Sequence, residues 1–105
     1  MIMIRAEFYE KKGLLTGFKF SGHSGHAEAG KDVVCAAVSS AVQLTANILE
    51  EFGHSPDIKV GDNVIECICM DGGDAPSRLL NVLKQHFEAI LEEFPDTIKI
   101  IISEV

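Results

Sequence analysis

The fold is decided by residues 21–51, which read SGHSGHAEAGKDVVCAAVSSAVQLTANILEE. The stretch begins with two histidines, His23 and His26, in a loop of small residues. It continues as a long apolar run whose spacing predicts a helix with Cys35 in its first turn. A thiol there lies at the positive end of the helix dipole, which favours the thiolate. An imidazole from the preceding loop would complete a nucleophile with its general base.

The predicted helix has clear end signals and a wide apolar surface. Asp32 is the best N-cap candidate, and Gly53 is placed to end the helix as a C′ glycine. Apolar and small residues follow the helix in two neighbouring stripes: Val34, Val38, Ala41, Thr45, Ile48 and Phe52 in one, and Cys35, Ser39, Val42, Ala46 and Leu49 in the other. Because the two stripes make an unusually wide surface, we expect this helix to be central and largely buried.

Alternating polar and apolar residues predict strands on both sides of this helix, over residues 2–10, 14–21, 58–60, 64–70 and 97–105. The first two form a hairpin through a turn at 11–13, and the next two form one with a three-residue turn at 61–63. A second helix is capped by Asp74, carries Pro76 in its first turn and ends at Pro95. The order ββαββαβ predicts an α+β two-layer sandwich, a mostly antiparallel sheet with both helices on one face.

Size and composition indicate one globular domain over residues 1–105. The net charge is −7, and the nine Lys and Arg residues are scattered, which argues against direct nucleic-acid binding because phosphates require clustered cations. No apolar run approaches the ~20 residues that a membrane span needs, so we expect no membrane partner. The three cysteines match no disulfide framework. We therefore expect a reducing, cytoplasmic setting.

Cys35 has two interpretations. Most cysteines outside disulfides are small buried hydrophobes, and this one lies on an apolar stripe. Its position in the first helical turn, the small residues before it and the two nearby histidines favour a nucleophile instead. His23 directly follows Gly22 at a strand end, where a rigid element would fix its ring. Rigidity therefore favours His23 over His26 as the base, although spacing alone does not decide.

Two polar residues near the cysteine also have alternative roles. Asp32 either starts the helix as its N-cap or orients the histidine, although a carboxylate beside Cys35 opposes thiolate formation. Ser39 lies one turn after Cys35 on the same helical face. It is either a small residue that permits close packing or a hydroxyl that binds the substrate or the histidine.

The remaining cysteines and the metal alternative carry weaker signals. Cys67 and Cys69 fall on one face of a strand, and we expect both in the core. A zinc site from the two loop histidines, Cys35 and His54 has suitable nitrogen and sulfur ligands. No known ligand spacing supports such a site, so we expect neither a metal nor another cofactor.

These residues resemble the ribosomal-processing cysteine protease (Prp) family: Gly22-His23, a small loop, Asp32-Val33-Val34-Cys35-Ala36 and then Ser39. Beyond this region the resemblance is one of length and ββαββαβ layout. It implies a small cytoplasmic homodimer that removes the N-terminal extension of a large-subunit ribosomal protein, a step that supports ribosome assembly. By position, Cys35 would be the nucleophile and His23 the base and acid, with supporting roles for Gly22, Asp32, Ser39 and His26.

Two other functions fit parts of the same sequence. The first is a non-catalytic, ribosome-associated binding module in which Cys35 is a packing residue. Thiol labelling tests it, because a buried structural cysteine reacts slowly at neutral pH. The second is a thiol redox protein, whose chemistry usually needs a resolving cysteine, for which Cys67 and Cys69 are the candidates, or a peroxide pocket. A mass shift after mild peroxide would reveal that chemistry.

Overall fold

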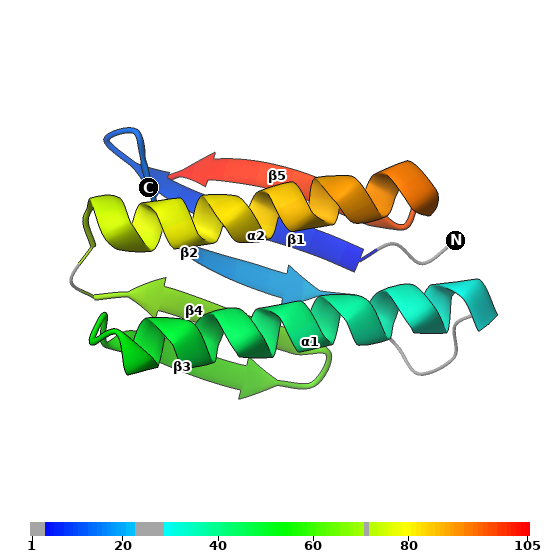
Figure 1. Ribbon diagram of the computed structural model, residues 1–105, viewed down its shortest axis with the longest axis horizontal. Helices are drawn as coiled ribbons and strands as arrows, with labels where there is room; N and C mark the ends of the chain where they lie inside the picture. The colour runs from blue at the N-terminus through cyan, green and yellow to red at the C-terminus, as the bar shows by residue number, and fades with distance from the viewer. Residues whose placement is uncertain (1–3, 23–28, 71) are drawn as a thin grey trace.

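In its described part, residues 4–22, 29–70 and 72–105, the computed structural model contains a five-stranded sheet with two helices on one face (Figure 1). The elements in chain order are β1 (Ile4–Lys11), β2 (Leu14–Ser21), α1 (Ala29–Glu51), β3 (Pro56–Gly61), β4 (Val64–Cys69), α2 (Asp74–Glu93) and β5 (Ile98–Glu104). This arrangement confirms the predicted ββαββαβ order and the α+β two-layer class.

The strands lie in the order β3-β4-β2-β1-β5. Strand β5 runs parallel to β1, and every other neighbouring pair is antiparallel, which confirms a mostly antiparallel sheet. The β3–β4 turn has two residues rather than the three predicted, because Gly61 and Val64 pair with each other at the strand ends. Asn63, with φ 56, completes this turn.

Aromatic residues hold α2 against the sheet. Phe8 and Phe20 on the strands and Phe87 on α2 are at most 1% exposed. The Phe20 and Phe87 ring centroids are 5.0 Å apart at an interplanar angle of 70°, and Phe8 meets Phe20 at 86°. Such edge-to-face contacts add to the free energy gained by burying the rings. These residues therefore fix the position of α2 over the centre of the sheet.

The C-terminal end of α1 forms as predicted. Gly53 has φ 78, its N–H donates to the Glu50 carbonyl at 3.1 Å, and the His54 N–H donates to the Leu49 carbonyl at 2.9 Å. This pair of bonds is a Schellman motif, which needs a residue that tolerates positive φ at C′. The motif stops α1 and directs the chain into β3.

The start of α2 differs from the prediction by one residue. Gly73, with φ 111, is the N-cap, and it has no side chain to accept a capping hydrogen bond. Asp74 is instead the first helical residue, where its carboxylate complements the helix dipole. Pro76 lies in the first turn, as predicted, because its missing N–H has no intrahelical partner to lose there.

Helix α1 is buried on one side only, which corrects the expectation of a largely buried helix. Its inward residues Val34, Val38 and Val42 are at most 2% exposed. Its outward Leu44 is 59% exposed, and Phe52, just beyond the helix, is 70% exposed. A two-layer fold covers only one side of a helix with the sheet, and α2 lies beside α1 rather than over it (Figure 1).

The apolar run in α1 is also longer than expected. Val33–Glu51 spans 19 residues with a mean hydropathy of 1.4, so by length and composition alone this helix is apolar enough to cross a membrane. The core helix of a globular protein passes the same test, and Val38 and Leu49 within the segment are packed in the core. The apolar residues on the inward side of this helix are therefore explained by their packing in the core.

Candidate active site

Cys35 lies in the second turn of α1, as its seventh residue, because the helix begins at Ala29. This corrects the prediction that Asp32 is the N-cap and that Cys35 lies in the first turn. Alanine and lysine favour helix, so Ala29 and Lys31 extend it before Asp32 despite the intervening glycine. The dipole effect falls off within the first turn. A thiolate at Cys35 would therefore be stabilised more by a neighbouring cation than by the helix dipole.

Cys35 is partly exposed and packs along the edge of the hydrophobic core. It shares a helical face with Ser39, one turn further along, which is also partly exposed. Cys67 and Cys69 are buried, which confirms their predicted place in the core. Partial exposure makes Cys35 the cysteine that a substrate can reach.

Cys67 is not suited to act as a nucleophile in the folded protein. The side chain of Cys67 is hydrogen-bonded to that of Cys69, and this bond together with burial raises the pKa of the Cys67 thiol far above its usual range. A thiol that stays protonated is a poor nucleophile. Because Cys67 and Cys69 are also buried, partly exposed Cys35 is the best candidate for nucleophilic chemistry at neutral pH.

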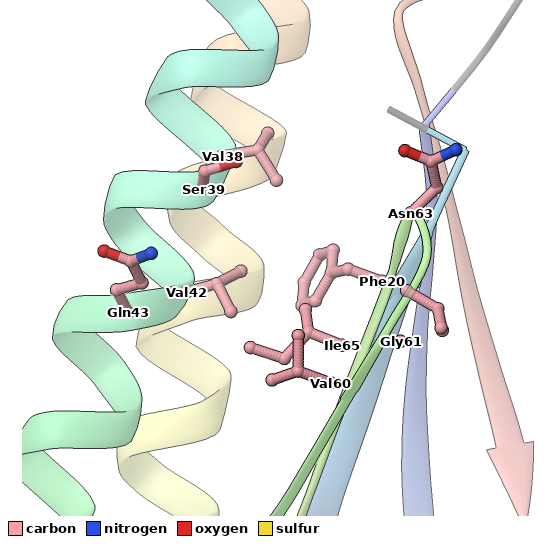
Figure 2. A pocket seen from close by; sticks show the side chains of 10 residues that line it. Phe20, Val38, Ser39, Val42, Gln43, Val60, Gly61, Asn63 and Ile65 are labelled. Atoms are coloured by element: carbon pink, nitrogen blue, oxygen red, sulfur yellow. The ribbon is translucent and has the colours of Figure 1, made fainter. Parts of the chain in front are cut away.

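A groove of about 150 Å³ opens beside Ser39, between α1 and the β3–β4 hairpin. Figure 2 shows its lining, with Val38 and Val42 of α1 across from Phe20. Polar groups come from Ser39, Gln43 and Asn63, while the other lining side chains are mainly apolar. The groove begins one helical turn from Cys35 and continues along α1 in the direction of Gln43. An apolar hollow with a few polar groups suits a side chain of an extended peptide.

The end of β2 is tied to this groove. The Gly22 N–H donates a hydrogen bond to the Asn63 carbonyl at 3.2 Å. Gly22 has φ 89, a conformation that side chains with a Cβ rarely adopt. Gly22, which directly precedes the predicted base His23 in the sequence, is therefore bonded to a residue that lines the groove.

Some of the predicted site lies outside the described residues. This applies to His23 and His26, whose roles as base and supporting residue stay predictions. For Asp32 the structure describes the backbone within α1, so its orienting role also stays a prediction. Among residues 4–22, 29–70 and 72–105, no group of three or more His, Cys, Asp or Glu residues could hold a metal ion.

The groove is lined by residues that the sequence analysis did not predict to be part of the site. Gln43 lies eight positions after Cys35, two turns along the same helical face, so helical spacing alone could have indicated it. Asn63 and Val60 reach the groove only because β3 pairs with β4 beneath α1. No local sequence signal reports that pairing.

Comparisons with known proteins identify the family and the fold. The family model for the cysteine protease Prp matches residues 3–99. A search of curated proteins finds no match. The fold is similar to that of SMU.848 from Streptococcus mutans, with a TM-score of 0.79, 26% identity, and coverage of 99% of this chain and 97% of that chain.

Two further similar structures are of the ribosomal processing protease Prp from S. aureus. In complex with a substrate peptide it has a TM-score of 0.87, and with a covalently linked product peptide 0.83. Each is 24% identical and covers 96% of this chain and 100% of that chain. Because the family model spans nearly the whole chain, including Cys35 and its groove, this chain belongs to the cysteine protease Prp family and is a cysteine protease.

Proposed function

We propose that this protease removes the N-terminal extension of a large-subunit ribosomal protein, with Cys35 as nucleophile and His23 as general base and acid. The observation that carries the proposal is a partly exposed Cys35 on α1, one turn from a groove that is open to an extended chain. The S. aureus protease, which has the same fold, is a ribosomal processing protease that takes a peptide substrate. Its complex with a covalently linked product peptide supports a covalent mechanism.

In this reaction the Cys35 thiolate attacks the carbonyl carbon of the scissile peptide bond. A carbon–sulfur bond forms, and the carbonyl electron pair moves to oxygen. When the carbonyl re-forms, the carbon–nitrogen bond breaks, and His23 donates a proton to the departing amine. Water, deprotonated by His23, then hydrolyses the thioester and restores the thiol. The peptide and water are the only reactants that this hydrolysis consumes.

The histidine has two tasks because of where Cys35 lies. In the second turn of α1 the thiolate gains little from the helix dipole, so an imidazolium partner must stabilise it before attack. Up to four backbone N–H groups at the start of a helix lack intrahelical partners, and α1 begins at Ala29. Such N–H groups could stabilise the oxyanion of the tetrahedral intermediate.

The groove beside Ser39 would bind the extended substrate. Its apolar lining suits one substrate side chain, while Gln43 and Asn63 carry amide groups that can pair with a peptide backbone. A net charge of −7 also favours a basic peptide over an acidic one. Gly22, Ser39 and His26 would support this site around the dyad.

We also propose that the protein acts as a homodimer in the cytoplasm. Cysteine usage without a disulfide framework fits a reducing compartment. Assembly can be measured separately from proteolysis, so the two parts of the proposal stand or fall independently.

The test is mass spectrometry of extended ribosomal proteins incubated with the wild-type chain and with Cys35→Ala. We expect a single N-terminal cut from the wild type and none from Cys35→Ala. Substitution of His23 with Ala should lower the cleavage rate by about 100-fold or more, and His26→Ala should lower it far less. Cleavage by Cys35→Ala would refute the nucleophile, and the reverse order of the histidine variants would move the base to His26.

A further inference from the structure

Strand β3 forms one edge of the sheet, and we call its unpaired side the β3 edge. The strand order ends with β3, which pairs with β4. Among residues 4–22, 29–70 and 72–105, no strand pairs with the β3 edge. Val60 and Gly61, at the end of β3, also line the groove beside Ser39. A peptide bound in that groove therefore lies next to an open strand edge.

The register of the β3–β4 hairpin shows which backbone groups point to the β3 edge. Gly61 and Val64 flank a two-residue turn and pair with each other. In such a hairpin the flanking residues exchange both hydrogen bonds, and bonded pairs then alternate with non-bonded pairs along the strands. Lys59 therefore bonds to β4, whereas the N–H and C=O groups of Ile58 and Val60 point to the β3 edge. Among the described turns and loops, no backbone group bonds to either residue.

Ile58 and Val60 also expose apolar side chains. They pair with Cys67 and Ile65, which pack in the core on the helix side of the sheet. Paired residues of neighbouring strands point to the same face, and Figure 2 shows Val60 and Ile65 both pointing toward α1. Ile58 is nevertheless 38% exposed and Val60 75% exposed. Open backbone groups beside exposed apolar side chains favour pairing with another extended chain.

A hollow lies on each face of the sheet at the β3 edge. On the helix side it is the groove beside Ser39, with its mainly apolar lining. On the outer face, a hollow of about 330 Å³ is lined by charged residues, Lys19, Lys59 and Glu66 among them. Val60 lines both hollows, which places them on the two sides of one strand. Successive side chains of an added strand point to opposite faces and would therefore enter the two hollows alternately.

Charges alternate across the outer face of the sheet and end with a cation at the β3 edge. Glu7, Lys19, Glu66 and Lys59 are paired in register across β1, β2, β4 and β3. Opposite charges at facing positions stabilise a sheet. An added strand continues the alternation where it places an acidic side chain opposite Lys59. The net charge of the chain acts on the whole peptide, whereas Lys59 acts on this one position.

We infer that the extension of the substrate binds as a strand added to the β3 edge, with its backbone paired to Ile58 and Val60. The inference rests on the proposed function and specifies how that site recognises its substrate. Strand β3 runs opposite to α1, so its Gly61 end lies toward the start of α1, where Cys35 is (Figure 1). A chain N-terminal to the cut runs toward Cys35 and is thus parallel to β3. In a parallel pair, the residue that bonds to both Ile58 and Val60 lies opposite Lys59.

The distance from the cysteine agrees with this placement. Gln43 lines the same groove as Val60 and follows Cys35 by eight residues. That separation spans about 12 Å of helix, which an extended chain covers in about four residues. The residues that pair with β3 therefore lie about three to six positions before the cut. Backbone pairing holds the extension, and the two hollows select its side chains, apolar on the helix side and acidic opposite Lys59.

The first test measures kcat/KM of the wild-type chain with peptides that span the extension and the cut. Each peptide carries one methylated backbone nitrogen before the cut. At about three to six residues from the cut we expect alternating effects, a loss of roughly tenfold where the N–H faces β3 and little change at the residues between. Losses that do not alternate would overturn the inference, because only every second N–H of a strand faces its neighbour.

The second test removes the N–H of Val60. Val60→Pro deletes a donor that points to the β3 edge and leaves the hydrogen bonds to β4, whereas the matched control Val60→Ala keeps the donor. We expect Val60→Pro to cleave roughly tenfold more slowly than Val60→Ala. Equal rates would show that the substrate does not pair here. Circular dichroism reports whether both variants fold, and if Val60→Pro does not, the methylation series decides without a variant.

The third test exchanges charge at Lys59. Two peptides carry Glu or Lys at a residue where methylation is harmful, and the wild type should cleave the Glu peptide about threefold faster. Lys59→Glu should reverse this preference. Lys99→Glu is the matched control, because Lys99 is exposed on β5 at the opposite edge of the sheet, and it should keep the wild-type preference. An unchanged preference in Lys59→Glu would contradict the placement of this side chain.

The same assay separates failure of the inference from failure of the proposed function. If the wild type cleaves no extension peptide, the proposed substrate is wrong and the inference falls with it. If the wild type cleaves the unmodified peptide but the methylation losses do not alternate, the proposed function stands and the extension does not pair with β3. Alternating losses together with slow cleavage by Val60→Pro establish the pairing.

Discussion

The Gly22 N–H donates a hydrogen bond to the Asn63 carbonyl at 3.2 Å, which joins the end of β2 to the turn between β3 and β4. The bond spans 41 positions of sequence and ends at a residue that lines the groove beside Ser39. Gly22 can make it because glycine tolerates φ 89. The bond therefore fixes the point at which the chain leaves the sheet toward His23.

Gly22→Ala should lower the cleavage rate roughly tenfold or more, because a small displacement of the predicted base costs much of its catalytic effect. The strained backbone should also cost about 1 kcal/mol in the free energy of unfolding. Gly13→Ala is the matched control, since Gly13 has φ 81 and lies in the β1–β2 turn with open space around it. It should lose similar stability and no activity. Equal cleavage by both variants would show that Gly22 does not position the base.

Alkylation should distinguish the three cysteines. At neutral pH a thiol reagent should label Cys35 first, because it is partly exposed. Cys67 should react only after unfolding, since its hydrogen bond with Cys69, followed by burial, raises its pKa. Peptide mapping of the labelled protein over time provides the measurement. Labelling of Cys67 in the folded protein as fast as Cys35 would contradict the assignment of the reactive thiol.

Tyr9 should titrate late and make stability fall at high pH. Burial, followed by its hydrogen bond to Glu66, raises its pKa from 10.0 to about 12. A raised folded-state pKa contributes stability that is complete below pH 10 and is lost as pH rises through about 12. Tyr9 is the single tyrosine and there is no tryptophan, so tyrosinate absorbance reports it alone. Tyr9→Phe should remove the pH dependence in this window, and an ordinary titration midpoint in the wild type would contradict the prediction.

Truncation of Phe87 on α2 should strongly destabilise the fold. It is 0% exposed and contacts both Phe8 and Phe20, so Phe87→Ala should lower the free energy of unfolding by about 3–5 kcal/mol. Phe52→Ala, at a position 70% exposed, should change it by less than about 0.5 kcal/mol. Urea unfolding followed by circular dichroism measures both. Comparable losses from the two variants would mean that the core is not centred on Phe87.

Much of this fold could be predicted because its signals are local. Alternation of Phe18 and Phe20 with Lys19 indicates a strand with one buried face, and the structure buries both rings. Gly53 marks the end of α1 because few other residues tolerate a C′ position with positive φ. Element order then limits the architecture to a small set of layered arrangements.

The remaining features depend on distant parts of the chain or on competition between local preferences. Asp32 is a good cap, but Ala29 and Lys31 favour helix, and the structure extends α1 through all three. Apolar periodicity predicts which residues of the helix could be buried, yet the layer arrangement leaves Phe52, the last residue of one predicted stripe, 70% exposed. Asn63 joins the site through strand pairing, which no pattern near Cys35 reports.

The central claim is that the sulfur of Cys35 forms the covalent intermediate. The most direct measurement mixes the chain with a peptide that spans the extension of the ribosomal protein, quenches it in acid and determines the intact mass and the labelled fragment. We predict an adduct equal to the N-terminal acyl fragment on the segment that contains Cys35, absent from Cys35→Ala. An adduct on another residue, or cleavage that proceeds in Cys35→Ala, would contradict the account.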